Sequence, residues 1–112
     1  MKNVLITAAA LGFGLLALEA QAIEKGNPER GQQLSTTCAA CHGPDGNSPT
    51  PQFPRIAGQY ADYMVHTLKA YKSGQRKNPI MAGITAGLSE QDMEDLAAYF
   101  SRQQGNLYNK SI

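Results

Sequence analysis

Apolar residues recur at helical spacing in three parts of this chain, and polar residues mark where those parts begin. The first helix is predicted to start with Asn27 as its N-cap and Pro28 at its first position, and to run towards Thr37. The second is predicted over residues 59–73 and ends before Gly74, because glycine readily adopts the left-handed conformation that closes a helix. Its apolar stripe consists of Tyr60, Met64, Leu68 and Tyr71.

The third predicted helix has the clearest start. Ser89 is its N-cap and Asp92 follows three residues later, a spacing typical of a capping box. We expect this helix to end at Gly105. Its buried face consists of Met93, Leu96, Ala97 and Phe100. No alternating β-branched run reaches five residues, so the chain is expected to be all-α, with three main helices joined by long loops.

The first 22 residues have the composition of a secretory signal peptide. Lys2 leads into an apolar run over residues 4–18, and Ala20-Gln21-Ala22 is a small-x-small cleavage pattern. The run is 15 residues long, whereas a bilayer-spanning helix needs roughly 20, which argues against a membrane anchor. We therefore expect export to the bacterial periplasm and a mature domain of residues 23–112 that has no stable membrane insertion.

The mature domain is small and nearly neutral. Cleavage would remove one basic and one acidic residue, so the net charge stays at +1, which argues against a nucleic-acid-binding protein. Residues 43–58 and 75–87 form long segments rich in Gly, Pro, Asn and Ser, which need something to wrap around. Both cysteines lie in one CxxC motif, so no long-range disulfide is available. We expect a prosthetic group to complete the core.

The segment Cys38-Ala39-Ala40-Cys41-His42 matches the CxxCH pattern of haem attachment. Two intervening residues let both sulfurs reach neighbouring edges of the porphyrin from one helical turn, and the imidazole that follows lies beneath the metal. One covalent haem c is therefore predicted on Cys38 and Cys41, with His42 as the proximal iron ligand. The alternatives are a thiol–disulfide oxidoreductase, which usually has a βαβ context, a structural zinc site, which needs four ligands, and a plain surface disulfide.

Four side chains could occupy the second axial position of the iron, namely Met64, Met81, Met93 and His66. Met64 and Met93 lie on apolar stripes, where methionine usually fills the core. His66 lies on the opposite, solvated face of its helix. Met81 lies in a predicted loop, residues 78–83, with no stripe to fill, so we expect it to be the distal ligand. A five-coordinate or His-ligated iron is the alternative.

Residues 26–102 resemble a class I c-type cytochrome of the small bacterial monohaem kind, which is also similar to one half of the tandem dihaem cytochromes. The resemblance is carried by residues 38–43, 53–59, 71–74, 76–81, 88–92 and 96–100. It implies that the carbonyl of Pro54 accepts a hydrogen bond from Nδ1 of His42 and fixes the ring orientation. It also implies that the first and third helices cross where Gly31 permits close approach to Tyr99 or Phe100.

A haem iron with both axial positions filled has no site for a substrate, which leaves one-electron transfer. We therefore expect an electron carrier rather than an enzyme. Its donor would be a quinol-oxidising complex or a dehydrogenase, and its acceptor a terminal oxidase or reductase. Two alternatives stay open: a gas-binding or peroxidatic haem protein, if Met81 is not bound, and a fixed haem subunit of a dehydrogenase or oxidase complex.

Two clusters of charge flank Met81. The basic cluster consists of Lys69, Lys72, Arg76 and Lys77. The acidic cluster consists of Glu90, Asp92, Glu94 and Asp95. Both could be ordinary solvated helix faces, or the basic cluster could surround an exposed haem edge and attract an acidic redox partner.

Overall fold

The computed structural model describes residues 25–105 together with Gly12 and Gly14. Over that part of the chain there are five helices and no strands, which confirms the all-α prediction. The helices are α1 (Pro28–Leu34), α2 (Thr36–His42), α3 (Ala61–Ser73), α4 (Pro79–Thr85) and α5 (Glu90–Ser101). Apart from the two glycines, the predicted signal peptide lies outside the described residues. Within the described part, no helix is long and apolar enough to cross a membrane.

The first predicted helix is two helices in the structure. α1 begins as expected, because the Asn27 side chain accepts a hydrogen bond from the backbone N–H of Arg30. At Ser35 both the backbone N–H and the hydroxyl donate to the carbonyl of Gln32, over 3.2 Å and 2.7 Å. These i→i−3 bonds tighten the turn and redirect the chain. The CxxCH motif therefore occupies a helix of its own, α2.

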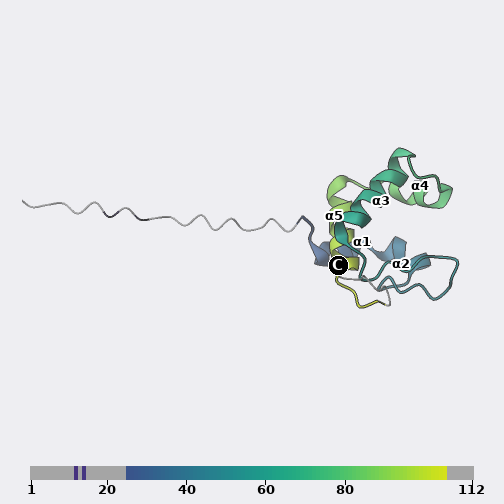
Figure 1. Ribbon diagram of the computed structural model, residues 1–112, viewed down its shortest axis with the longest axis horizontal. Helices are drawn as coiled ribbons and strands as arrows, with labels where there is room; N and C mark the ends of the chain where they lie inside the picture. The colour runs from purple at the N-terminus through teal and green to yellow at the C-terminus, as the bar shows by residue number, and fades with distance from the viewer. Residues whose placement is uncertain (1–11, 13, 15–24, 106–112) are drawn as a thin grey trace, which may run out of the picture.

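α1 and α5 cross at Gly31. A Cβ atom at this position would lie 2.0 Å from the carbonyl oxygen of Asp95 and 2.9 Å from Cβ of Tyr99. Only glycine lets the two backbones approach this closely. The close approach to Tyr99 that the resemblance implied is therefore confirmed, and Figure 1 shows the two helices next to each other.

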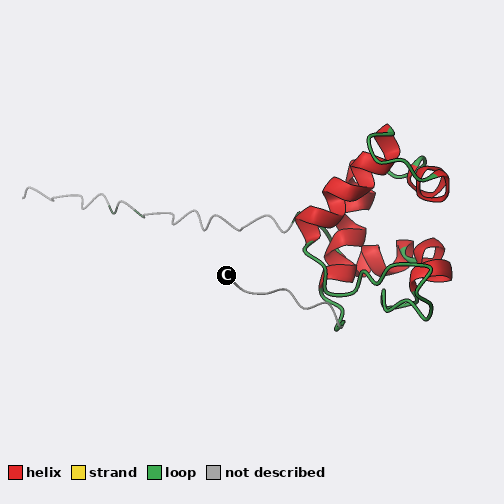
Figure 2. Ribbon diagram, turned by 45° about the vertical axis from the view of Figure 1, so that its right-hand side comes forward, coloured by secondary structure: helices red, strands yellow, loops and turns green. Residues whose placement is uncertain are grey.

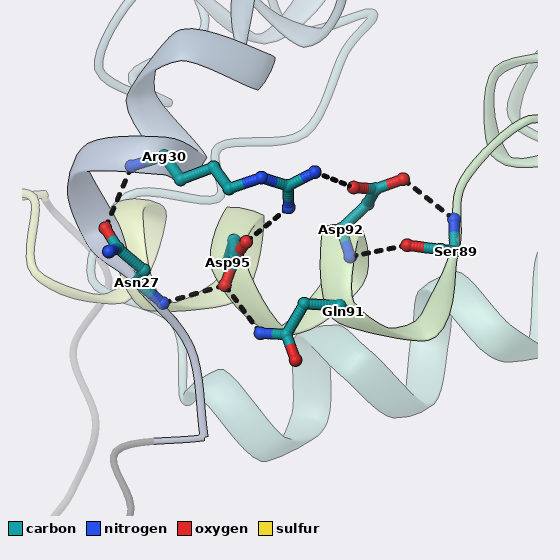
Figure 3. Close-up of polar contacts among 6 residues, drawn as sticks. All are labelled: Asn27, Arg30, Ser89, Gln91, Asp92 and Asp95. Carbon is teal, nitrogen blue, oxygen red and sulfur yellow. Dashed lines mark hydrogen bonds and ion pairs between the residues drawn. The ribbon is translucent and has the colours of Figure 1, made fainter.

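A network of hydrogen bonds and ion pairs stabilises the crossing of α1 and α5 (Figure 3). Asp95 is only 1% exposed, and its carboxylate accepts hydrogen bonds from the backbone N–H of Asn27 and from the guanidinium of Arg30. Arg30 also reaches Asp92, which forms the predicted capping box with Ser89. A solvated face for the whole acidic cluster is therefore wrong, since Asp95 is buried and paired.

The apolar core lies where α3 packs against α5. Its buried members are Met64, Val65, Leu96, Ala97 and Phe100. α3 starts at Ala61, two residues later than the predicted bound, and ends at Ser73 as predicted. Gly74 follows as its C-cap, with the left-handed φ of 81° expected there. α5 ends at Ser101 rather than at Gly105. The residues after it turn back on the core, where Gly105 lies so close to Ala57 that a Cβ atom would be 2.4 Å from the Ala57 carbonyl oxygen.

Met81 lies on a helix and not in a loop, which corrects the prediction. Asn78 is the N-cap of α4 and Pro79 occupies its first turn. This Asn-Pro pair is the same start signal that identified α1 at Asn27. The sequence pattern did not predict this helix, because its seven residues are too few to show an apolar stripe. α4 packs against α3.

Candidate haem site

A cavity of about 510 Å³ lies between α2 and α4, two helices that Figures 1 and 2 show at separate places on the domain. Its volume is within the range of roughly 300–1,000 Å³ that is usual for ligand and cofactor pockets. The residues predicted to contact the haem all line it, namely Cys38, Cys41, His42, Pro54 and Met81. Much of the remaining wall is apolar and includes Phe53, Ile56, Leu68, Ile84, Leu96 and Phe100.

His42 is buried at the end of α2, and its Nδ1 lies 2.7 Å from the carbonyl oxygen of Pro54. A carbonyl can only accept a hydrogen bond, so Nδ1 must carry the proton. In the neutral ring this leaves Nε2 with its lone pair available to a metal. The contact that the resemblance implied is thus present, and it selects the tautomer that a proximal iron ligand requires.

The two thiols of α2 are half-buried and are not joined in a disulfide. Burial raises the pKa of the Cys38 thiol. A thiol–disulfide oxidoreductase needs the opposite, a thiol with a lowered pKa that ionises near neutral pH. Among the residues that the structure describes, no group of three or more His, Cys, Asp and Glu side chains could hold a metal ion, so a zinc centre has no support there. The thiols suit covalent attachment to a flat apolar group in the cavity.

The structure separates the four candidates for the second axial ligand. His66 is exposed and Met93 is 2% exposed in the core, and neither lines the cavity. Met64 does line it but belongs to the core cluster shared with α5. Met81 is half-buried on the helix across the cavity from α2. A planar group in the cavity would have His42 and Met81 on different walls.

Two arginines lie in the cavity wall. Sequence reasoning missed Arg55, whereas Arg76 belongs to the basic cluster for which a place around the haem edge was one hypothesis. Arg55 and Arg76 are the only Lys, Arg, Asp or Glu residues among the described residues that line it. The guanidinium of Arg76 lies 5.0 Å from the centre of the Tyr71 ring, which is a cation–π distance. Arg55 follows Pro54 directly in the sequence, so its position next to the His42 contact was the available signal.

Most of the basic cluster has partners within the chain. Lys69 forms an ion pair with Glu90, and Lys72 donates a hydrogen bond to the carbonyl of Leu88. Both lysines thus connect α3 to the start of α5. Arg76 lies on Tyr71, so three of the four cations have a partner within the chain, and all four are exposed. Lys77 is exposed.

These features define the class of protein. An all-α domain with two thiols and an imidazole on one wall of an apolar cavity, and a thioether on another, fits a covalently attached haem. The family model described as Cytochrome c matches residues 28–103. The chain belongs to the cytochrome c family, whose members carry electrons and are not enzymes, and this membership implies a covalent haem c.

Several relatives show the type of cytochrome c. The chain is 41% identical to cytochrome c4 of Pseudomonas aeruginosa, over 91% of this chain and 49% of that protein. It is 42% identical to cytochrome c-554(548) of Halomonas halodenitrificans, over 70% of this chain and 99% of the relative. The crystal structure of reduced recombinant cytochrome c4 from Pseudomonas stutzeri matches with a TM-score of 0.69 and 45% identity, over 73% of this chain and 48% of that one. The chain therefore spans about half the length of the cytochrome c4 proteins it matches.

Two further relatives have names that refer to dehydrogenases. The thiosulfate dehydrogenase electron acceptor of Stutzerimonas stutzeri is 36% identical over 88% of this chain and 47% of its own length. The cytochrome subunit of sulfide dehydrogenase of Chlorobaculum tepidum is 33% identical over 96% of this chain and 94% of its own length.

Proposed function

We propose that this protein is a periplasmic electron carrier with one haem c, attached through Cys38 and Cys41 and ligated by His42 and Met81. One observation carries the proposal: a single apolar cavity is lined by both thiols and the imidazole from α2 and by the thioether from α4. With both axial positions filled, no position is left for a substrate, so the protein transfers electrons without chemical conversion of a bound molecule.

The chain would control the potential of this centre in three ways. The bound haem supplies an iron that alternates between the ferric and ferrous states. The Met81 thioether favours the ferrous state relative to a second imidazole. The apolar wall and the charges of Arg55 and Arg76 also disfavour the additional positive charge of the ferric state. The carbonyl of Pro54 holds the His42 ring in place and raises its basicity as a ligand, which by itself favours the ferric state. We expect the first two effects to outweigh this one and to give a positive reduction potential.

The names of the two dehydrogenase-related proteins support a dehydrogenase as electron donor and other redox proteins as acceptors. A shuttle between such partners is the first candidate. A second candidate is a haem subunit permanently bound to a dehydrogenase, which the sulfide dehydrogenase subunit favours because this chain covers 94% of its length. Size-exclusion chromatography of the native protein separates them, since a shuttle elutes as a small cytochrome and a subunit elutes with its enzyme.

The ligation is tested by replacing Met81 with Ala in the haem-loaded protein. We expect the reduction potential to fall and the ferrous form to bind carbon monoxide, because the replacement opens one axial position. Met64→Leu is the matched control, since Met64 is the other thioether of the cavity wall and should leave both properties near those of the parent. A potential that is unchanged in Met81→Ala refutes the assignment. Ready carbon monoxide binding by the parent protein would favour a five-coordinate, gas-binding or peroxidatic protein.

A further inference from the structure

Both backbone polar groups of Met81 are held by side chains of α4 and its cap. The Oδ1 atom of Asn78 accepts hydrogen bonds from the backbone N–H groups of Ile80 and Met81, over 3.0 Å and 3.1 Å. The hydroxyl of Thr85 donates to the carbonyl oxygen of Met81 over 2.8 Å. Thr85 is fully buried, with an exposed fraction of 0%.

These two contacts matter because α4 is a weak element by itself. It has seven residues, and helices of this length are not stable in water without tertiary contacts. It packs against α3. The place of Met81 relative to the cavity therefore depends strongly on the bonds that define the first turn and the end of this helix.

We infer that Asn78 and Thr85 are positioning residues for the distal iron ligand, and that they limit how often the Met81 sulfur leaves the iron. The inference rests on the proposed ligation by Met81. Neither side chain needs to contact the metal, because each acts through the backbone of Met81. Loss of either bond lets α4 fray and increases the population in which the axial position is open.

The population with an open position is measured by carbon monoxide binding to the ferrous, haem-loaded protein. Apparent affinity for a ligand scales with the fraction of molecules that can accept it. A side-chain hydrogen bond of ordinary strength corresponds to about a fivefold change in an equilibrium. We therefore expect Asn78→Ala and Thr85→Val each to raise the apparent carbon monoxide affinity about fivefold. The absorption band from methionine-to-iron charge transfer in the ferric form should weaken in both variants.

The chain offers matched controls for each bond. Asn27 caps α1 before a proline in the same way and accepts from the N–H of Arg30 over 3.0 Å. Ser101 makes a comparable hydroxyl bond within α5, to the carbonyl of Ala98 over 3.2 Å, and does not line the cavity. Asn27→Ala and Ser101→Ala should lower the free energy of unfolding without changing carbon monoxide affinity or the charge-transfer band.

Two conservative variants separate hydrogen bonding from packing. Asn78→Ser keeps a capping oxygen, and Thr85→Ser keeps the hydroxyl but removes a buried methyl group. Both should retain Met81 ligation close to that of the parent, whereas Thr85→Val, which keeps the volume, should not. If Thr85→Ser opens the site as much as Thr85→Val does, Thr85 acts through packing and the inference is wrong.

The outcomes also distinguish this inference from the proposed ligation. If Met81→Ala leaves the charge-transfer band and carbon monoxide binding unchanged, the ligation by Met81 fails, and the inference fails with it. If Met81→Ala has the expected effect but Asn78→Ala and Thr85→Val behave like the two controls, the ligation stands and only the positioning role is overturned.

Discussion

Arg30 of α1 and Asp95 of α5 form an ion pair in which the carboxylate is buried and the guanidinium is half exposed. The carboxylate side chain is 1% exposed and the arginine side chain 46%. Only Ser35 separates α1 from α2, the helix that carries the CxxCH motif. The pair therefore ties the helix with the CxxCH motif, through α1, to the helix that forms half of the core.

Replacing Arg30 with Met should destabilise the protein through Asp95. The carboxylate would keep its bonds to the Asn27 N–H and the Gln91 side chain but lose its charged partner in a buried position. Leaving a buried acceptor short of a partner costs about 1–3 kcal/mol of unfolding free energy. The midpoint of urea unfolding measures this loss.

The surface pair of Lys69 and Glu90 is the comparison for that experiment. Both side chains are largely exposed, so Lys69→Met should cost less than about 1 kcal/mol. If Arg30→Met and Lys69→Met lower the free energy of unfolding equally, the burial of Asp95 does not determine how much its ion pair contributes to stability.

Stability should fall as the pH is lowered below about 4. Burial by itself would raise the pKa of Asp95, but hydrogen bonds from Asn27, Arg30 and Gln91 outweigh it, and the net pKa is lowered. Bonds from the Ser89 backbone and from Arg30 lower the pKa of Asp92 as well. The unfolded chain therefore binds protons more readily than the folded one, so this contribution is present above the unfolded pKa and is lost as the pH falls through the folded pKa.

Urea unfolding between neutral pH and about pH 2 tests this dependence. In Asp95→Asn the titrating group is absent, so its stability should depend less steeply on acid pH than that of the parent. The prediction is wrong if the two proteins lose stability in parallel over the whole range.

Two glycines should respond to alanine in opposite directions. Gly31→Ala places a Cβ atom 2.0 Å from the Asp95 carbonyl oxygen, so α1 and α5 must separate. We expect the free energy of unfolding to fall by about 1–3 kcal/mol, which is the usual cost of overpacking a core. At Gly83 in α4 a Cβ atom meets nothing within 4 Å, and alanine should stabilise the helix by about 0.5–1 kcal/mol. In thermal unfolding, the midpoint temperature should be lower than that of the parent for Gly31→Ala and higher for Gly83→Ala.

The cations that precede α4 should affect the rate of electron exchange. Lys77 is exposed and Arg76 lines the cavity, so reversing both charges to Glu should slow exchange with the anionic probe hexacyanoferrate by up to about tenfold at low salt. High salt should abolish the difference, because the screening length falls from about 10 Å at 0.1 M to 3 Å at 1 M ionic strength.

The control replaces a cation that does not line the cavity. Lys25 lies before α1, and Lys25→Glu changes the net charge by two units, half the change in the double variant. It should have little effect on the rate with hexacyanoferrate. A similar slowing in this variant would mean that net charge acts, rather than the position of Lys77 and Arg76.

The helix starts could be predicted because their signals are local. Asn27 and Ser89 satisfy backbone N–H groups within three residues of themselves, so the pattern that caps a helix is complete in a short stretch of sequence. The CxxCH motif is equally local, since its spacing alone places two sulfurs and an imidazole within about one turn. The start of α4 could have been predicted for the same reason, because the Asn78 cap repeats the signal at Asn27. The helix is too short, however, to show an apolar stripe in the sequence.

What the sequence by itself determined is therefore the helical class, the attachment motif on α2 and the apolar stripes of α3 and α5. Only the tertiary structure decided that Asp95 is buried against Arg30 and that Arg55 and Arg76 share one cavity wall. These features depend on contacts between residues far apart in the chain. A charged side chain looks the same in the sequence whether water or a buried partner surrounds it, and only packing determines which of the two it meets.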